Sequence, residues 1–201
     1  EAFPRFSTKR SIARFIVKHD LFKKILTVNG SIIECGVFNG AGIFTWANLS
    51  EIYEPVNHTR KIIGFDTFEG FPSVNLKDNT SKFKSNKGDL CGDSFNSLKE
   101  SIIKHDYERN LEHINKIELV KGDFLKTGKN YITENPHLLI SLLYLDFDLY
   151  EPTLEALKIF LPRMCKGSLI VFDELNCINF PGETQAYLEY IQKNNLKLCR
   201  S

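Results

Sequence analysis

Short apolar runs recur along the chain, and a glycine or an acidic residue follows each of them. The run Leu138–Leu145 is the clearest, because six of its eight residues are large and aliphatic before the chain turns acidic at Asp146 and Asp148. An uninterrupted run of this length is typical of a strand buried on both faces of a parallel sheet. Four further runs predict strands of the same kind: Ser31–Val37, Lys61–Phe65, Ile117–Val120 and Ser168–Phe172.

Apolar residues at helical spacing separate these runs. Residues Arg10–Leu26 predict two short helices with a break near Asp20, and Ser97–Glu100 resembles a capping box that opens a helix reaching about Leu111. Further helices are expected near residues 42–49, 129–135, 152–161 and 187–191. The alternation predicts an α/β fold, in which a doubly wound, mostly parallel sheet carries helices on both faces.

Length and charge narrow the class of protein. The chain has 201 residues, of which 42% are hydrophobic, and this fits a single domain spanning 1–201. Lys and Arg number 26 against 25 Asp and Glu, so the sequence has no electrostatic footprint for nucleic acid or an anionic membrane. We therefore expect no nucleic acid and no membrane as partner.

Three segments lie outside the regular alternation. Residues 1–30 are expected to be N-terminal helices, and the polar residues from Phe71 to Asp93 begin a lid-like insertion that extends to Leu111. The chain stops just as a strand-like segment begins at Leu196, so we expect the C-terminal hairpin of the sheet to be truncated.

Cysteine usage indicates a reducing compartment. The five cysteines are odd in number, and no two of them have the CxxC spacing of zinc or thioredoxin-type sites. No signal peptide is visible, and no apolar run reaches the length of a membrane span. A cytoplasmic location is the expectation that follows.

A carboxylate stands at the end of every predicted strand. In an open α/β sheet the carboxyl ends of the strands face one crevice, where ligands bind. Several unpaired anions there would repel one another, so they predict a ligand with hydroxyls, an amine or a metal ion. The five acids are Glu34, Asp66, Asp123, Asp146 and Asp173.

The first strand leads into a glycine turn. Gly36, Gly40 and Gly42 allow a ligand to approach the backbone closely, but the spacing is GxxxGxG rather than the GxGxxG of dinucleotide sites. Turning the chain is an equally good explanation for these glycines. Asp66 ends the next strand, where an acid commonly accepts hydrogen bonds from ribose hydroxyls, although a turn-forming role is the alternative.

Four acids from neighbouring strand ends suggest a metal. Asp146, Asp148 and the adjacent pair Asp173-Glu174 supply oxygen ligands of the kind that suits Mg²⁺. Capping of the following helices is the alternative role for Asp146 and Asp173. Asp148 lies one strand period beyond Asp146, so the two point to the same side if the strand stays regular.

The motifs together resemble a known family. The segments IIECGVFNGAG, IIGFDTFEGFP, VKGDF, LDFDLYEPT and KGSLIVFDEL, followed by PGETQAYLEYI, resemble the macrocin O-methyltransferase family over most of Ser31–Ile191. Its members are class I methyltransferases of Rossmann-like fold, which use S-adenosylmethionine to methylate sugar hydroxyls. The resemblance implies a small-molecule acceptor, a sugar or a glycosylated metabolite, and possible homo-oligomers.

The resemblance also implies roles for single residues. Asp148 corresponds to the general base, and Asp146, Asp173 and Glu174 would hold Mg²⁺, although some members have two Asp where this chain has Asp173-Glu174. The ribose would bind at Asp66, and the adenine near Asp123. The full set expected to contact S-adenosylmethionine is Glu34, Gly36, Val37, Phe38, Asn39, Gly40, Asp66, Thr67, Asp123, Phe124 and Asp146.

The chemistry agrees with these roles, and two alternatives stay open. A sugar hydroxyl is a poor nucleophile, so a divalent ion that lowers its pKa and a carboxylate that removes its proton would both promote methyl transfer. An NAD-dependent oxidoreductase would share the alternating sheet, and a non-catalytic S-adenosylmethionine-binding domain would share the cofactor loop. If the acceptor carried a phosphate, Lys82, Lys84 and Lys87 would be the first residues to test.

Overall fold

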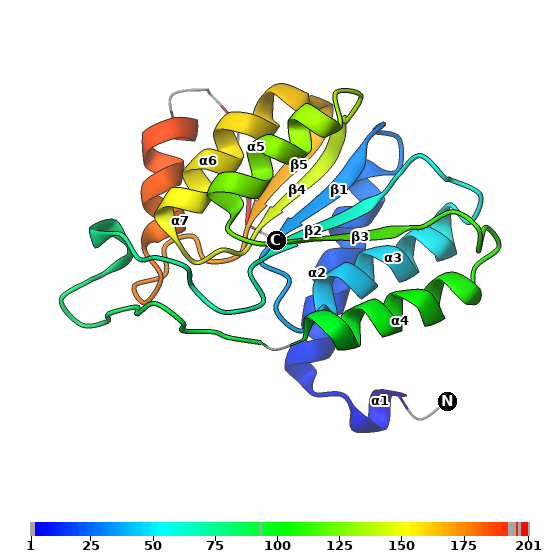
Figure 1. The fold of residues 1–201 in the computed structure, drawn as a ribbon, viewed down its shortest axis with the longest axis horizontal. Coiled ribbons are helices and arrows are strands. Elements are labelled where there is room, and N and C mark those ends of the chain that lie inside the picture. The colour runs from blue at the N-terminus through cyan, green and yellow to red at the C-terminus, as the bar shows by residue number, and fades with distance from the viewer. Residues whose placement is uncertain (1–2, 93, 193–195, 197, 201) are drawn as a thin grey trace.

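The computed structural model describes residues 3–92, 94–192, 196 and 198–200. Five parallel strands form one sheet in the order β3-β2-β1-β4-β5 (Figure 1). The strands are β1 (Ser31–Cys35), β2 (Ile62–Asp66), β3 (Ile117–Lys121), β4 (Ile140–Leu145) and β5 (Met164–Phe172). Every strand predicted from the apolar runs is present, and the doubly wound parallel sheet is confirmed.

Helices cover both faces of this sheet (Figure 1). One face carries α2 (Lys9–Ile25), α3 (Ala41–Tyr53) and α4 (Phe95–Tyr107), and the other carries α5 (Phe124–Glu134), α6 (Tyr150–Phe160) and α7 (Gly182–Ala186). A short helix, α1 (Phe3–Phe6), precedes them. Single turns of other helix types complete the described elements: η1 (Leu76–Asp78), η2 (Leu161–Arg163) and η3 (Tyr187–Ile191).

Two apolar clusters hold the layers together. Successive residues of a strand point to opposite faces, so Ile33 and Phe65 pack toward α5 and α6 while Ile32 and Ile62 pack toward α2 and α3. Every residue of β1 and β4 is buried, since these central strands are covered on both sides. This explains why their sequences are nearly continuous apolar runs.

The direction of winding reverses between β1 and β4. From β1 the chain proceeds outward to β2 and β3 and then returns to β4 on the other side of β1. The loops that leave β1 and β4 therefore diverge, and a crevice forms beyond their carboxyl ends. The two loops stay connected at their base, where the Asp146 N–H donates to the Cys35 carbonyl at 2.8 Å.

Several boundaries differ from the sequence predictions. The break expected near Asp20 is wrong, because α2 continues through it and places Leu21, Phe22 and Ile25 on its buried face. Helix α4 begins two residues before the expected Ser97, and α5 begins directly after Asp123. Of the strand-like segment 196–201, the described residues 196 and 198–200 belong to no strand, while 197 and 201 lie outside the described residues.

The polar residues 71–92, called the insertion from here on, pack against the end of the sheet (Figure 1). Asp78 is buried in it, and its carboxylate accepts the N–H of Tyr150 at 2.6 Å and that of Asn75 at 2.7 Å. The Phe83 and Phe180 rings also meet, with centroids 5.4 Å apart. The insertion is thereby attached to the first turn of α6 and to the loop after β5. No helix among the described residues is long and apolar enough to cross a membrane.

Candidate active site

A cavity of about 360 Å³ lies at the carboxyl ends of the strands. The last residue of β2 and the residues directly after the other four strands line it, and α2 and the insertion contribute further lining residues. This volume is in the range of pockets that hold small ligands. The strand-end residues in its wall are Gly36, Asp66, Asp123, Asp146 and Asp173.

Asp66 organises the turn that follows β1. One of its carboxylate oxygens accepts the N–H groups of Val37 and Phe38 at 2.7 and 2.8 Å, and the other accepts that of Phe68 at 2.6 Å. Asp66 therefore has the turn-forming role that the sequence offered as the alternative to ribose binding. A carboxylate has about four acceptor positions, so Asp66, which also lines the cavity, retains capacity for a ligand hydroxyl.

Glu34 is absent from the wall of the cavity. Its buried carboxylate accepts the Trp46 indole N–H at 2.6 Å, and an added Cβ on Gly42 would stand 2.2 Å from both of its oxygens. Gly42 thus makes room for an internal carboxylate, which the sequence did not reveal. Burial raises the pKa of Glu34 to about 7, against the opposing charge of Lys18.

The remaining expected cofactor residues divide into two groups. Phe38, Thr67, Asp123 and Phe124 line the cavity, whereas Val37, Asn39 and Gly40 are absent from its wall. Asp123 also caps α5, since its carboxylate accepts the Leu125 N–H at 3.0 Å. Phe124 is buried beside it, with its ring centroid 4.9 Å from that of Phe147.

One trio of acids comes together within the described part of the chain. Asp146, Asp148 and Glu183 each place a carboxylate oxygen within 4.8 Å of the other two. Strand β4 ends at Leu145 and Asp148 has a left-handed backbone, with φ of 62°, so the strand does not stay regular as the sequence analysis assumed. Asp148 nevertheless reaches the vicinity of Asp146 through this turn.

Burial and mutual repulsion raise the pKa values of this trio. Burial, followed by the charges of Asp173 and Asp148, raises the pKa of Asp146 to about 8. Burial and then Glu174 raise the pKa of Asp148 to about 7, and burial holds the pKa of Glu183 well above its ordinary range. A bound cation would lower all three pKa values and relieve the repulsion.

Glu183 is the residue of this group that sequence reasoning missed. It is fully buried, and its two oxygens accept the backbone N–H of Asp148 at 3.3 Å and that of Glu174 at 3.1 Å. It therefore ties the loop after β4 to the loop after β5. Its position in the PGETQAYLEYI segment was the available indication, but an acid at the start of a helix ordinarily reads as solvent-exposed.

Asp173 and Glu174 line the cavity beside the trio. The Tyr144 hydroxyl donates to Asp173, and the Arg14 guanidinium lies 3.8 Å from the other oxygen of this carboxylate. Other lining residues that the sequence analysis did not single out come from α2, the insertion and the loop before α7: Arg10, Arg14, Pro72, Ser73, Asn75, Leu90 and Phe180.

The parallel sheet, the cavity at its winding reversal and the acids at its strand ends define a Rossmann-like methyltransferase. Residues 13–198 match the family model of macrocin O-methyltransferase (TylF), and the chain belongs to that family. The family and the O-methyltransferase class expected from the sequence are both confirmed.

Solved structures agree with this assignment. CalS11, described as a calicheamicin methyltransferase, is 36% identical over 98% of this chain and 77% of its own, with a TM-score of 0.93. An apo structure of CalS11, described as TDP-rhamnose 3'-O-methyltransferase, is 33% identical over 98% of this chain and 78% of its own, with a TM-score of 0.83. The O-methyltransferase NovP, 19% identical over 91% and 72% with a TM-score of 0.70, shares the fold. A comparison with curated proteins found no match.

Proposed function

We propose that this protein transfers a methyl group from S-adenosylmethionine to a hydroxyl of a sugar or a related small polyhydroxylated acceptor, with Mg²⁺ as the metal. The observation that carries the proposal is the pair of acids with raised pKa values in the wall of the strand-end cavity, Asp146 and Asp148. The similarity to CalS11, described as acting on TDP-rhamnose, supports a sugar as acceptor.

The cofactor would occupy the half of the cavity next to β1, β2 and β3. Gly36, Asp66, Thr67, Asp123 and Phe124 line this half, and the glycine leaves the backbone open to a ligand. When bound, S-adenosylmethionine supplies an electrophilic methyl group on a sulfonium centre. The cationic sulfonium fits a wall that is rich in carboxylates, since opposite charges attract strongly in a partly buried site.

Asp148 is the proposed general base. It lines the cavity, only 8% of its surface is exposed, and burial raises its pKa to about 7. A base with a pKa near the operating pH is effective, because it is ionised often enough and still binds a proton well. Asp148 would accept the acceptor's hydroxyl proton as the new carbon–oxygen bond forms and the bond from sulfur to the methyl carbon breaks.

Asp146, Asp173 and Glu174 are the proposed Mg²⁺ ligands. Glu183 groups with Asp146 and Asp148, but both of its oxygens already accept backbone N–H groups, so its proposed role is to hold the two loops in place. With the metal assigned to Asp146, Asp173 and Glu174, Asp148 is free to accept the proton of the acceptor hydroxyl. When bound, the metal would polarise the acceptor hydroxyl.

Product formation and binding test the proposal separately. We expect release of S-adenosylhomocysteine when the protein is incubated with S-adenosylmethionine, Mg²⁺ and a panel of free and nucleotide-linked sugars. S-Adenosylhomocysteine should raise the thermal midpoint, because it binds only the folded state. Stabilisation by NAD alone would instead favour the oxidoreductase. Cofactor binding without turnover on any acceptor would favour a non-catalytic domain.

A further inference from the structure

We infer that Arg10 and Arg14 form a subsite for the diphosphate group of a nucleotide-linked acceptor. The inference rests on the proposed function and deepens it, since it names the chemical class of the acceptor. Both arginines lie in α2, and both line the cavity that contains the proposed base and metal ligands.

These two residues are the cationic part of the cavity wall. Among the described residues that line the cavity, only these two are Lys or Arg, whereas eight are Asp or Glu. An anion in this cavity would be repelled by the strand-end carboxylates and attracted to the α2 side. The wall therefore separates into an acidic region for cations and a basic region for one anionic group.

The arginine side chains are available to a ligand. Arg14 has 60% of its side chain exposed, and its recorded ion pair is the 3.8 Å approach to Asp173, which leaves most of its donors open. Within the described part of the chain, no hydrogen bond or ion pair involves the Arg10 guanidinium. A guanidinium presents five donors in a planar fork that matches two oxygens of a phosphate.

The spacing of the two arginines favours a diphosphate over a single anionic group. Residues four apart on a helix lie on one face, with Cβ atoms about 5–6 Å apart. Two long side chains from such positions can each bind one of two adjacent phosphates. Asp173 pairs with Arg14 and is also a proposed metal ligand, so the anionic group would lie next to the reacting sugar.

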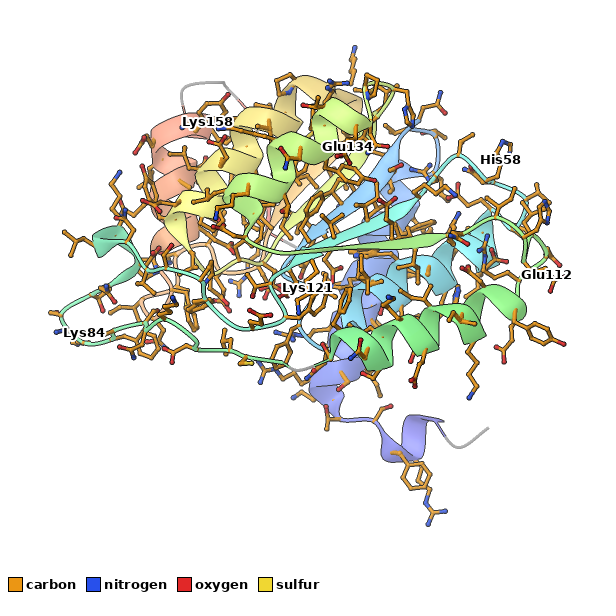
Figure 2. The ribbon with its side chains drawn as sticks, in the orientation of Figure 1. His58, Lys84, Glu112, Lys121, Glu134 and Lys158 are labelled. Atoms are coloured by element: carbon orange, nitrogen blue, oxygen red, sulfur yellow. The ribbon has the colours of Figure 1, made fainter. Side chains whose placement is uncertain are left out.

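The lysines expected from the sequence do not serve this purpose. Lys82, Lys84 and Lys87 are absent from the cavity wall. Figure 2 shows Lys84 at the outer tip of the insertion, pointing away from the sheet. A phosphate held there would be outside the cavity, so the basic residues that matter are those of α2.

Binding of inorganic pyrophosphate tests the inference without knowledge of the nucleoside. We expect calorimetric titration in EDTA, with S-adenosylhomocysteine saturating, to detect pyrophosphate binding to the unaltered protein. Arg10→Ala and Arg14→Ala should each weaken it on the order of tenfold, because each removes a bidentate charged contact. Arg14→Lys should recover only part of the loss, since a lysine keeps the charge without the planar fork.

Lys23→Ala is the matched control. It removes one positive charge from an exposed position of the same helix outside the cavity wall, and it should leave pyrophosphate affinity unchanged. Glucuronate serves as the carboxylate probe and inorganic phosphate as the single-phosphate probe, and both should bind more weakly than pyrophosphate. Thymidine diphosphate should bind at least as well as pyrophosphate and show the same dependence on the arginines.

Three results would overturn the inference. They are absence of pyrophosphate and thymidine diphosphate binding, equal binding by the arginine variants and the unaltered protein, and tighter binding of glucuronate or single phosphate. Affinity for S-adenosylhomocysteine is measured alongside in every variant. If the unaltered protein binds S-adenosylhomocysteine but not pyrophosphate, the diphosphate subsite alone is refuted. If the unaltered protein does not bind S-adenosylhomocysteine, the proposed function is refuted.

Discussion

Gly36 lies directly against Asp146, so that an added Cβ on Gly36 would stand 2.0 Å from the Asp146 carbonyl oxygen. The Gly36 backbone also has a left-handed φ of 93°, which side chains disfavour. The two residues follow β1 and β4, the strands between which the winding reverses. This contact sets how closely the glycine turn after β1 approaches Asp146, the proposed metal ligand.

Gly36→Ala should destabilise the protein by about 2–4 kcal/mol, because the backbone of the β4 loop must move. Gly88→Ala is the control, since Gly88 has a similar φ of 87° but nothing within 4 Å of the added atom. It should cost only about 1–2 kcal/mol of backbone strain. Urea unfolding measures both, and equal losses would show that φ rather than the contact with Asp146 makes glycine necessary.

Asp146→Asn should weaken binding of a divalent cation by about tenfold or more, since it removes an anionic ligand. Titration with Mn²⁺, followed by electron paramagnetic resonance, measures this without turnover. Glu112→Gln is the charge-matched control, because Figure 2 shows Glu112 at the far end of the molecule. Glu174→Gln should weaken cation binding more than Glu183→Gln does. The reverse order would assign the ligand role to Glu183.

Activity should rise with pH up to about 7. Burial raises the pKa of Asp148 to about 7 when no metal is bound, and a general base works only when ionised, so the rate is lost as pH falls through the pKa of Asp148. A bound cation would shift the rise to lower pH. Asp148→Asn should lower turnover by about a hundredfold or more and keep S-adenosylhomocysteine affinity. A variant with full turnover would exclude Asp148 as the base.

Glu34 should make the protein less stable as pH rises from about 4.5 to 7. Burial raises its pKa from 4.5 to about 7, so the folded state holds a proton that the unfolded state has lost. The stabilisation is complete below 4.5 and lost above 7, with an upper limit of about 3 kcal/mol at about 1.4 kcal/mol per pKa unit.

Glu34→Gln isolates this contribution from those of the other buried acids. The amide oxygen can still accept the Trp46 indole hydrogen bond and cannot ionise. The difference in unfolding free energy between the two proteins should therefore change across this pH window. Parallel curves from pH 4 to 8 would mean that Glu34 does not titrate there.

Asp78→Ala should release the insertion from α6. The change removes acceptors for two backbone N–H groups and should cost about 1–3 kcal/mol. Hydrogen exchange should accelerate at Tyr150 and across residues 71–92. Asp89→Ala removes a hydrogen bond to Asn86 within the same insertion and should leave Tyr150 protected. Unchanged exchange at Tyr150 in Asp78→Ala would show that other contacts hold the insertion.

Sequence patterns were most informative where a residue acts through its own strand or turn. Apolar runs predicted all five strands, and the acids that follow them predicted four of the strand-end carboxylates in the cavity wall. Helix boundaries were less accurate, because a cap such as Asp123 or a continued buried face such as that of α2 decides where a helix begins or ends. Local polarity does not determine those contacts.

The amino-acid sequence by itself determined the alternating parallel sheet, the family and the group of acids at one edge, because these depend on periodicity and on chain order. Only the tertiary structure decided that Glu34 faces Trp46, that Glu183 lies beneath Asp148, and that Arg10 and Arg14 enter the cavity wall. Each of these contacts joins elements distant in the chain. Their direction depends on how helices pack across the sheet, which no local pattern of residues specifies.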